Sequence, residues 1–208
     1  MMYNTTYKYN LLFGNNLYTK LIKTAIYRPY EYPFDMKEIN EKSEKALKDD
    51  SYLSMVKYNS GYCKYNHLKS NGIEMNDRDK KIYNDIQTAY DKVEPLSYPI
   101  NLFHGFELGM KYPKFEKNNV IQFDFILSKT PSWQVANFFA SHNCNLINKY
   151  MYILYPPNTK HLSIDIRLNF NNEYEYLAIN EKLRYIDKVY HLSLWPLSLN
   201  IYLIMFNL

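Results

Sequence analysis

The stretch Asn172-Glu173-Tyr174-Glu175-Tyr176-Leu177-Ala178-Ile179 places two carboxylates two positions apart in an aromatic and apolar run. Side chains at positions i and i+2 of a β-strand point to the same face. We therefore expect Glu173 and Glu175 to stand together on one surface, with Tyr174 and Tyr176 on the other. Mutual repulsion separates the pKa values of such a pair, which suits one carboxylate to stabilising positive charge and the other to proton chemistry.

A Glu-x-Glu pair is not specific by itself. The chain has a second acidic pair at this spacing, Asp77-Arg78-Asp79, and chance alone produces about two such pairs in a chain of this acidity. The second pair begins a predicted helix, where carboxylates interact favourably with the helix dipole. The pair at Glu173 and Glu175 therefore needs partner residues before it indicates a site.

Earlier segments place polar residues on two predicted strands. A short apolar run after a proline presents His104 beside Gly105, whose missing side chain lets a ligand approach the backbone. A later strand ends in the hydroxyl residues Ser128 and Thr130. The segment that follows has apolar residues at helical spacing, and Ser132 is its predicted N-cap.

The order of these motifs resembles the ADP-ribosyltransferase superfamily. In that family the NAD pocket is built by an Arg or His on the first core strand, a Ser-Thr-Ser type turn on the second, and a Glu or Glu-x-Glu on a later strand. The matching residues here are His104, Ser128, Thr130, Glu173 and Glu175. The resemblance covers roughly residues 55 to 190, and a helical prefix typical of toxin-type members is matched by Tyr58, Tyr62, Asn66 and Leu68.

The resemblance implies a role for each residue. Glu175 binds the ribose 2′ hydroxyl of NAD and stabilises the oxocarbenium ion that forms as nicotinamide leaves, while Ser128 holds this carboxylate in place. Glu173 orients or deprotonates the acceptor, an arginine in Glu-x-Glu members. The main chain of Gly105 binds the nicotinamide amide, His104 and Thr130 contact the cofactor, and Trp133 or Phe138 stacks on nicotinamide.

The first motif departs from the usual combination. Glu-x-Glu members usually carry Arg at the first position, whereas His-Gly, as at His104-Gly105, is typical of the poly-ADP-ribose polymerase branch. The sequence leaves open how the adenine ribose and phosphates are held, because neutral His lacks the fixed charge of Arg.

The resemblance implies a mono-ADP-ribosyltransferase with NAD as substrate and a protein acceptor, and it implies no metal. An NAD glycohydrolase and a non-catalytic binding module of the same fold are the alternatives. The net charge of +4 is too small to favour nucleic acid as the acceptor. Cys63 and Cys144 lack metal-ligand spacing and are expected to be free thiols.

We expect an α+β fold, with N-terminal helices followed by a split mixed or antiparallel β-sandwich core of the ADP-ribosyltransferase type. A single domain over 1–208 is predicted, with an arm and helices in 1–97 and a β-rich NAD-binding core in 98–208. Residues 1–30 show no clear period and are expected to be an arm packed on the core. Helices are predicted from Asp35, over 52–68 and from Asp77.

The sequence shows no cleavable signal segment at its start. The apolar stretch from Leu192 to Leu208 is interrupted by Pro196 and falls short of a membrane span, so it is predicted to form one or two strands. We therefore expect a monomer without membrane contact in the cytoplasm of the producing cell or of a target cell.

Overall fold

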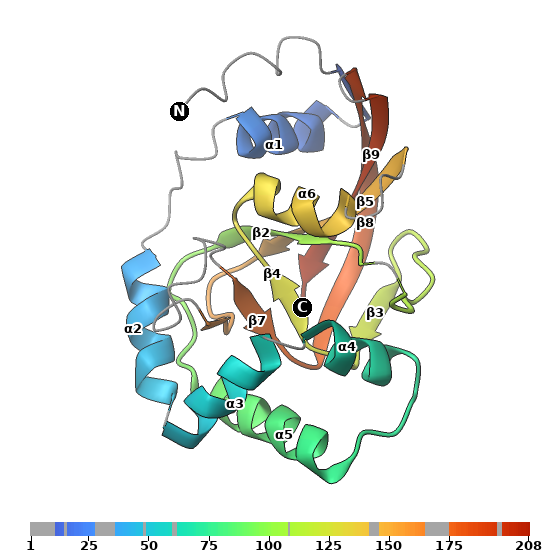
Figure 1. Ribbon diagram of the computed structural model, residues 1–208. Coiled ribbons are helices and arrows are strands. Elements are labelled where there is room, and N and C mark those ends of the chain that lie inside the picture. Colours follow the sequence, from blue (N-terminus) through green and yellow to red (C-terminus); the bar gives the residue numbers. More distant parts are fainter. Residues whose placement is uncertain are drawn as a thin grey trace, which may run out of the picture.

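The computed structural model describes most of the 208-residue chain (Figure 1). The residues outside the description are 1–10, 15, 28–35, 48, 60–61, 108, 142–145, 165–174 and 195–196. The predictions for Glu173, Tyr174, Asp35 and Cys144 fall on these residues, and so lie outside the described structure.

Six helices are described, five of them in the first half of the chain. They are α1 (Asn16–Tyr27), α2 (Met36–Ala46), α3 (Asp49–Asn59), α4 (Tyr62–Ser70), α5 (Asp77–Lys92) and α6 (Trp133–Ser141). The helix expected over 52–68 is therefore two helices, α3 and α4. The start of α5 is confirmed: the Asn76 side chain caps it by accepting a hydrogen bond from the Asp79 amide at 2.8 Å.

The strands form two sheets. The larger contains β1 (Leu11–Gly14), β2 (Ile100–Gly105), β3 (Val120–Phe123), β5 (Ile147–Tyr155), β8 (Glu181–Leu194) and β9 (Leu197–Asn207). Its order is β1-β8-β9-β5-β2, with β3 also paired to β8, and only the β5–β9 pair is parallel. The smaller sheet, in the order β4-β7-β6, is antiparallel and contains β4 (Leu127–Lys129), β6 (Leu162–Ser163) and β7 (Tyr176–Ala178).

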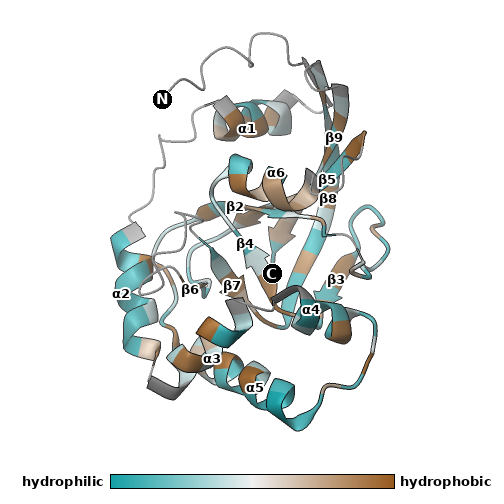
Figure 2. Ribbon diagram, in the orientation of Figure 1, coloured by the Kyte–Doolittle hydropathy of each residue, from teal (hydrophilic) through white to brown (hydrophobic). Residues whose placement is uncertain are grey.

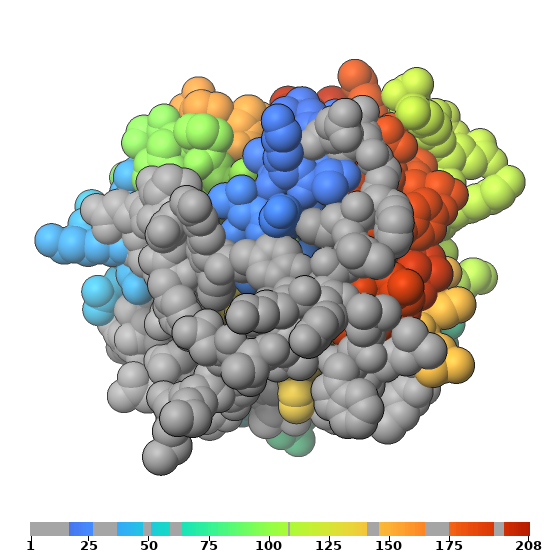
Figure 3. Space-filling view, turned by 90° about the horizontal axis from the view of Figure 1, so that it is seen from above, coloured from blue at the N-terminus to red at the C-terminus, as the bar shows by residue number. Residues whose placement is uncertain are grey.

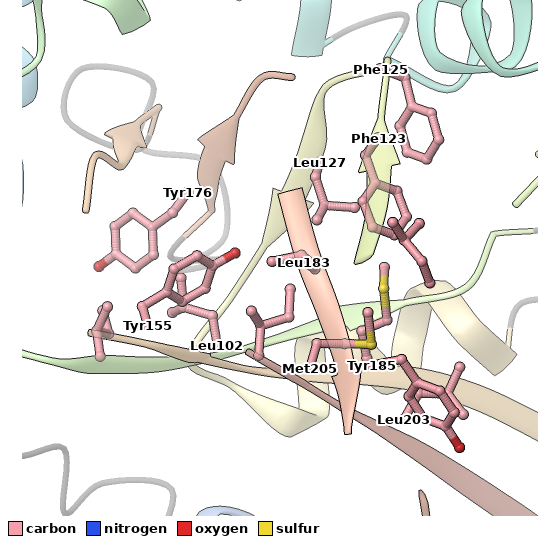
Figure 4. Close-up of a cluster of buried hydrophobic side chains, with 14 of the residues drawn as sticks. Leu102, Phe123, Phe125, Leu127, Tyr155, Tyr176, Leu183, Tyr185, Leu203 and Met205 are labelled. Carbon is pink, nitrogen blue, oxygen red and sulfur yellow. The ribbon is translucent and has the colours of Figure 1, made fainter. Parts of the chain in front are cut away.

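The elements stack in layers, because alternate residues of each strand pack on opposite faces. Leu102 of β2 and Tyr176 of β7 belong to the core between the two sheets, which Figure 4 shows in close-up. Phe103 of β2 packs on the other face of the large sheet with α1 and α6. Leu177 of β7 packs with α3 and α5 on the outer face of the small sheet. The α+β fold with a split β-sandwich is therefore confirmed.

Helix amphipathicity fits this layering. In Figure 2 each of the helices α2, α3 and α5 has both hydrophilic (teal) and hydrophobic (brown) residues. In α5 the buried apolar residues include Ile82, Ile86 and Ala89, which recur at spacings of four and three, so one face meets the small sheet. No helix in the described parts of the chain is long and apolar enough to cross a bilayer.

The N-terminal region, for which the sequence shows no clear period, contains two regular elements that pack on the core: β1 pairs with β8, and α1 buries Ile22 and Ile26 against the large sheet. Figure 3 shows the surface of α1, in blue, beside the orange-red C-terminal strands. The single strand expected to run from Phe123 and to end in the hydroxyls of Ser128 and Thr130 was wrong, because Phe123 ends β3 and Leu127 begins β4, in a different sheet. Phe125 and Ile126 between them are buried in different cores, so the chain crosses from one sheet to the other.

Candidate active site

The pairing of β4 with β7 brings Ser128 and Glu175 together. In this antiparallel pair Lys129 lies opposite Tyr176, and Ser128 lies opposite Leu177. Glu175 comes immediately before β7 and is buried, with 7% of its surface exposed. The Ser128 hydroxyl donates a hydrogen bond to Glu175 Oε1, so the contact predicted between these two residues is present.

His104 lies on the face of β2 that looks toward β4. Its Nδ1 is 2.7 Å from the Ser128 carbonyl oxygen, which can only accept, so Nδ1 carries the proton. Burial lowers the pKa of His104 to about 4, and the neutral ring therefore accepts at Nε2 a hydrogen bond from the Tyr112 hydroxyl at 2.9 Å. Both ring nitrogens are thus engaged by protein groups.

The same chain of contacts reaches a residue that no sequence motif singles out. The backbone amide of Glu107 donates to the Tyr112 hydroxyl at 3.1 Å. From Glu107 the hydrogen bonds continue through Tyr112 and His104 to Ser128 and end at Glu175. These contacts link the loop after β2 to the backbone of Ser128 in β4, whose hydroxyl in turn holds Glu175.

One pocket collects most of the predicted residues. It is lined by Phe103, His104, Gly105, Glu107, Ser128, Lys129, Thr130, Val135, Ala136, Phe139 and Glu175. The structure therefore brings together His104, Gly105, Ser128, Thr130 and Glu175. Figure 1 shows how: α6 packs on one side of β2, and β4 and β7 lie on its other side.

Gly105 has a structural reason to lack a side chain. A Cβ atom built on Gly105 would lie 2.2 Å from the carbonyl oxygen of Ala136, so α6 packs directly on the backbone of β2 here. Thr130 ties β4 to the same strand, because its backbone exchanges hydrogen bonds of 2.8 and 2.7 Å with Phe103. As predicted, Ser132 caps α6 by accepting from the Val135 amide at 3.4 Å.

The structure does not bring Trp133 to the pocket. Its ring packs with the core cluster under α1 and lies 6.4 Å from the His191 ring. Phe138 is 57% exposed. The aromatic residue of α6 that lines the pocket is Phe139, which the sequence alone did not indicate because helical spacing does not separate it from its neighbours.

Lys129 points into the core between the sheets. Its ammonium lies 2.8 Å from the Tyr155 hydroxyl and 3.3 Å from Glu181 Oε2, and the side chain is fully buried. Burial lowers the pKa of Lys129 to about 8, while the charge of Glu181 acts in the opposite direction. The residue in the middle of the hydroxyl motif therefore anchors β4 to the large sheet.

Helix α3 contributes a buried tyrosine next to the carboxylates. Tyr58 is fully buried and accepts a hydrogen bond from the Asn66 amide at 3.2 Å. Burial raises its pKa well above the usual value, and the charges of Glu175 and Glu107 act in the same direction. The helical part of the chain thus packs against the candidate site.

Comparison with solved structures relates this arrangement to known proteins. Plx2a, an ADP-ribosyltransferase toxin from Paenibacillus larvae, superimposes with a TM-score of 0.66 at 12% identity, over 83% of this chain and 92% of the toxin. The chain has the ADP-ribosyltransferase fold. Exoenzyme S from Pseudomonas aeruginosa, in complex with human 14-3-3 protein beta and bound to Carba-NAD, has this fold, with a TM-score of 0.59 and 16% identity over 89% of this chain and 87% of its own.

A third solved structure with this fold is an ADP-ribosyltransferase from Clostridium botulinum. It has a TM-score of 0.58 and 13% identity over 85% of this chain and 98% of its own. No protein-family model and no curated protein matches the sequence. Within the described residues, no group of three or more His, Cys, Asp or Glu side chains is placed to hold a metal ion.

Proposed function

We propose that this chain is a mono-ADP-ribosyltransferase that cleaves NAD and transfers ADP-ribose to an arginine side chain of a protein. The observation that carries the proposal is the hydrogen bond from Ser128 to Glu175, two residues that line one pocket in an ADP-ribosyltransferase fold. Exoenzyme S bound to Carba-NAD and the Clostridium perfringens toxin BECa with NADH support NAD as the nucleotide.

The chemistry follows from the charge that develops when nicotinamide leaves. Breaking the bond from ribose C1′ to the ring nitrogen gives the ribose oxocarbenium character, as in glycoside cleavage. In our proposal the Glu175 carboxylate binds the ribose 2′ hydroxyl and stabilises this charge. A fixed carboxylate in a water-poor pocket stabilises it more than a mobile one does, and the Ser128 hydrogen bond supplies that fixation.

The contacts to NAD are assigned from the pocket lining. We assign the main chain of Gly105 to the nicotinamide amide, and Thr130 to the wall of the same pocket. Contact between His104 and the adenine-side ribose requires the Tyr112 hydroxyl to leave Nε2. The stacking role first expected for Trp133 passes in our proposal to Phe139, since Phe139 lines the pocket.

Glu173 is assigned to the acceptor by its place in the Glu-x-Glu motif, and it lies outside the described residues. The enzyme is proposed to work as a monomer in the cytoplasm of the producing or a target cell. NAD and a protein containing the acceptor arginine are its partners there.

Incubating the purified chain with adenylate-labelled NAD and a cell lysate tests the proposal. Transfer to arginine is supported if protein becomes labelled and if this label disappears when excess agmatine is added as an alternative guanidinium acceptor. Free ADP-ribose alone indicates a glycohydrolase, label on nucleic acid indicates a different acceptor, and no reaction indicates a non-catalytic module. The Glu175→Gln variant, run in parallel, separates catalysis from chemical breakdown of NAD.

A further inference from the structure

Glu107 is the second acidic residue in the described lining of the pocket. It lies in the loop after β2, whereas Glu175 comes immediately before β7, the central strand of the small sheet, so the two acidic residues line the pocket from different elements. Glu107 is partly buried. Neither the motifs nor their spacing pointed to it.

Hydrogen bonds tie the backbone at Glu107 to the residues that hold Glu175. Its amide donates to Tyr112, Tyr112 donates to His104, and His104 donates to the Ser128 carbonyl. Ser128 in turn holds Glu175. Each link is formed by buried or partly buried groups, and a hydrogen bond in such surroundings holds its partners more strongly than one in water. The loop carrying Glu107 is thus tied to the strand that carries Ser128.

The charges around the pocket favour a cation. Its charged lining residues within the described chain are Glu107, Glu175 and Lys129. The ammonium of Lys129 pairs with Glu181 in the core, and the ring of His104 is neutral. Among the described lining residues, carboxylates therefore outnumber cations, and the charges of both carboxylates add to the effect of burial in raising the pKa of Tyr58.

We propose that Glu107 is a specificity-determining residue that binds the guanidinium group of the acceptor beside the ribose. This inference rests on the proposed function. A carboxylate and a guanidinium form two parallel charge-assisted hydrogen bonds, which orient one nitrogen toward a fixed point. That nitrogen then gives its electron pair to ribose C1′ as nicotinamide leaves with the pair of the broken bond, and the nitrogen loses one proton to a carboxylate or to water.

The test measures nicotinamide release from NAD, with and without agmatine, in wild type, Glu107→Gln and Glu107→Asp. We expect agmatine to accelerate release by wild type and to yield ADP-ribosyl-agmatine. In Glu107→Gln, the agmatine-dependent rate should fall about tenfold through a higher KM for agmatine, and this loss should clearly exceed any loss of nicotinamide release measured without agmatine. Glu107→Asp keeps the charge and should recover part of the agmatine-dependent rate.

Glu116→Gln is the matched control, because Glu116 lies in the same loop, is exposed and pairs with Lys114 at 2.6 Å. It should leave both rates unchanged. Equal loss of both rates in Glu107→Gln would overturn the acceptor role, and so would unchanged transfer. A wild type that releases nicotinamide without any effect of agmatine would overturn the guanidinium assignment, whereas a wild type that releases none would overturn the proposed function itself.

Discussion

Ser128 and Glu175 are 47 positions apart in the sequence, and the hydroxyl of the first donates a hydrogen bond to the carboxylate of the second. The contact exists because β4 and β7 pair in the small sheet. Lys129 lies opposite Tyr176, and Ser128 and Glu175 are the residues immediately before these two. A carboxylate at a strand edge would otherwise sample several rotamers. The serine therefore sets the direction in which the negative charge faces the pocket.

Replacing Glu175 by Gln is expected to remove most of the activity, because the side-chain shape stays while the charge that stabilises the oxocarbenium ion is lost. We expect nicotinamide release to fall by about 100-fold or more, equivalent to about 3 kcal/mol in the barrier. The urea midpoint should stay near that of wild type. Turnover at the wild-type rate would exclude Glu175 from the mechanism.

Replacing Ser128 by Ala should lower kcat about tenfold, with a smaller effect on the KM for NAD. The carboxylate remains but loses the group that orients it, and a single positioning hydrogen bond to a charged group contributes about 1.5 kcal/mol. Ser128→Thr keeps a hydroxyl and should restore part of kcat. If the Ala and Thr variants were equally slow, loss of packing would account better for the effect than loss of the hydroxyl.

Acid should destabilise the fold between pH 6.5 and about 4 through its buried histidines. Burial lowers the pKa of His104 and of His191 to about 4, so in this window the unfolded chain binds protons that the folded chain does not. The free energy of unfolding should therefore fall as pH drops below 6.5, by up to roughly 1.4 kcal/mol per pH unit for each histidine. Urea denaturation at pH 7, 6 and 5 measures the slope. In His104→Gln the dependence of the free energy of unfolding on pH should be weaker by about the contribution of one histidine. An unchanged slope would contradict the lowered pKa of His104.

Replacing Lys129 by Met should destabilise the protein strongly, because it leaves the Glu181 carboxylate buried without its cation. Loss of one partner of a buried ion pair typically costs about 3 to 5 kcal/mol. The double variant Lys129→Met with Glu181→Gln should recover part of that loss, since no unpaired charge remains. Equilibrium urea unfolding gives both values, and a single variant as stable as wild type would show that the pair contributes little.

Replacing Gly105 by Ala should displace α6, because the added Cβ would overlap the carbonyl oxygen of Ala136 at 2.2 Å. Forced overlap in a packed interior costs about 1 to 3 kcal/mol, and the pocket wall formed by α6 should move with it. We expect a lower unfolding midpoint together with weaker NAD binding by calorimetry. Gly72→Ala is the comparison: Gly72 has φ +67° and open space around it, so its replacement should cost stability and leave NAD binding intact.

The parts of the site that were predictable from sequence are those carried by short local patterns. His104-Gly105 on a strand, the hydroxyls in and just after β4 and the glutamate before β7 follow from strand periodicity together with a resemblance in motif order. Glu107 and Tyr112 could not be predicted in this way. They lie in a loop without periodicity, and only the folded chain places Tyr112 beside His104 and Glu107 beside Tyr112.

Burial also changes one expectation about substitution. The family accepts Arg where this chain has His104, which suggests by resemblance that an arginine would fit. In the structure this side chain is 3% exposed and hydrogen-bonded on both sides. A longer and permanently charged guanidinium would need new partners there, because an unpaired buried charge is costly. Such constraints come from packing, which one sequence does not reveal.

The placement of β9 in the sheet has a consequence for the order in which the protein is built. β9 lies between β8 and β5, and β5 in turn holds β2 with its His104. During synthesis every residue named in the pocket leaves the ribosome before β9 (Leu197–Asn207) does. β9 is the strand that pairs with both β5 and β8, so these two strands are joined in one sheet only after β9 has been made. The strand that carries His104 and the strands that pair with β8 therefore become parts of one continuous sheet only when β9 is inserted between β5 and β8.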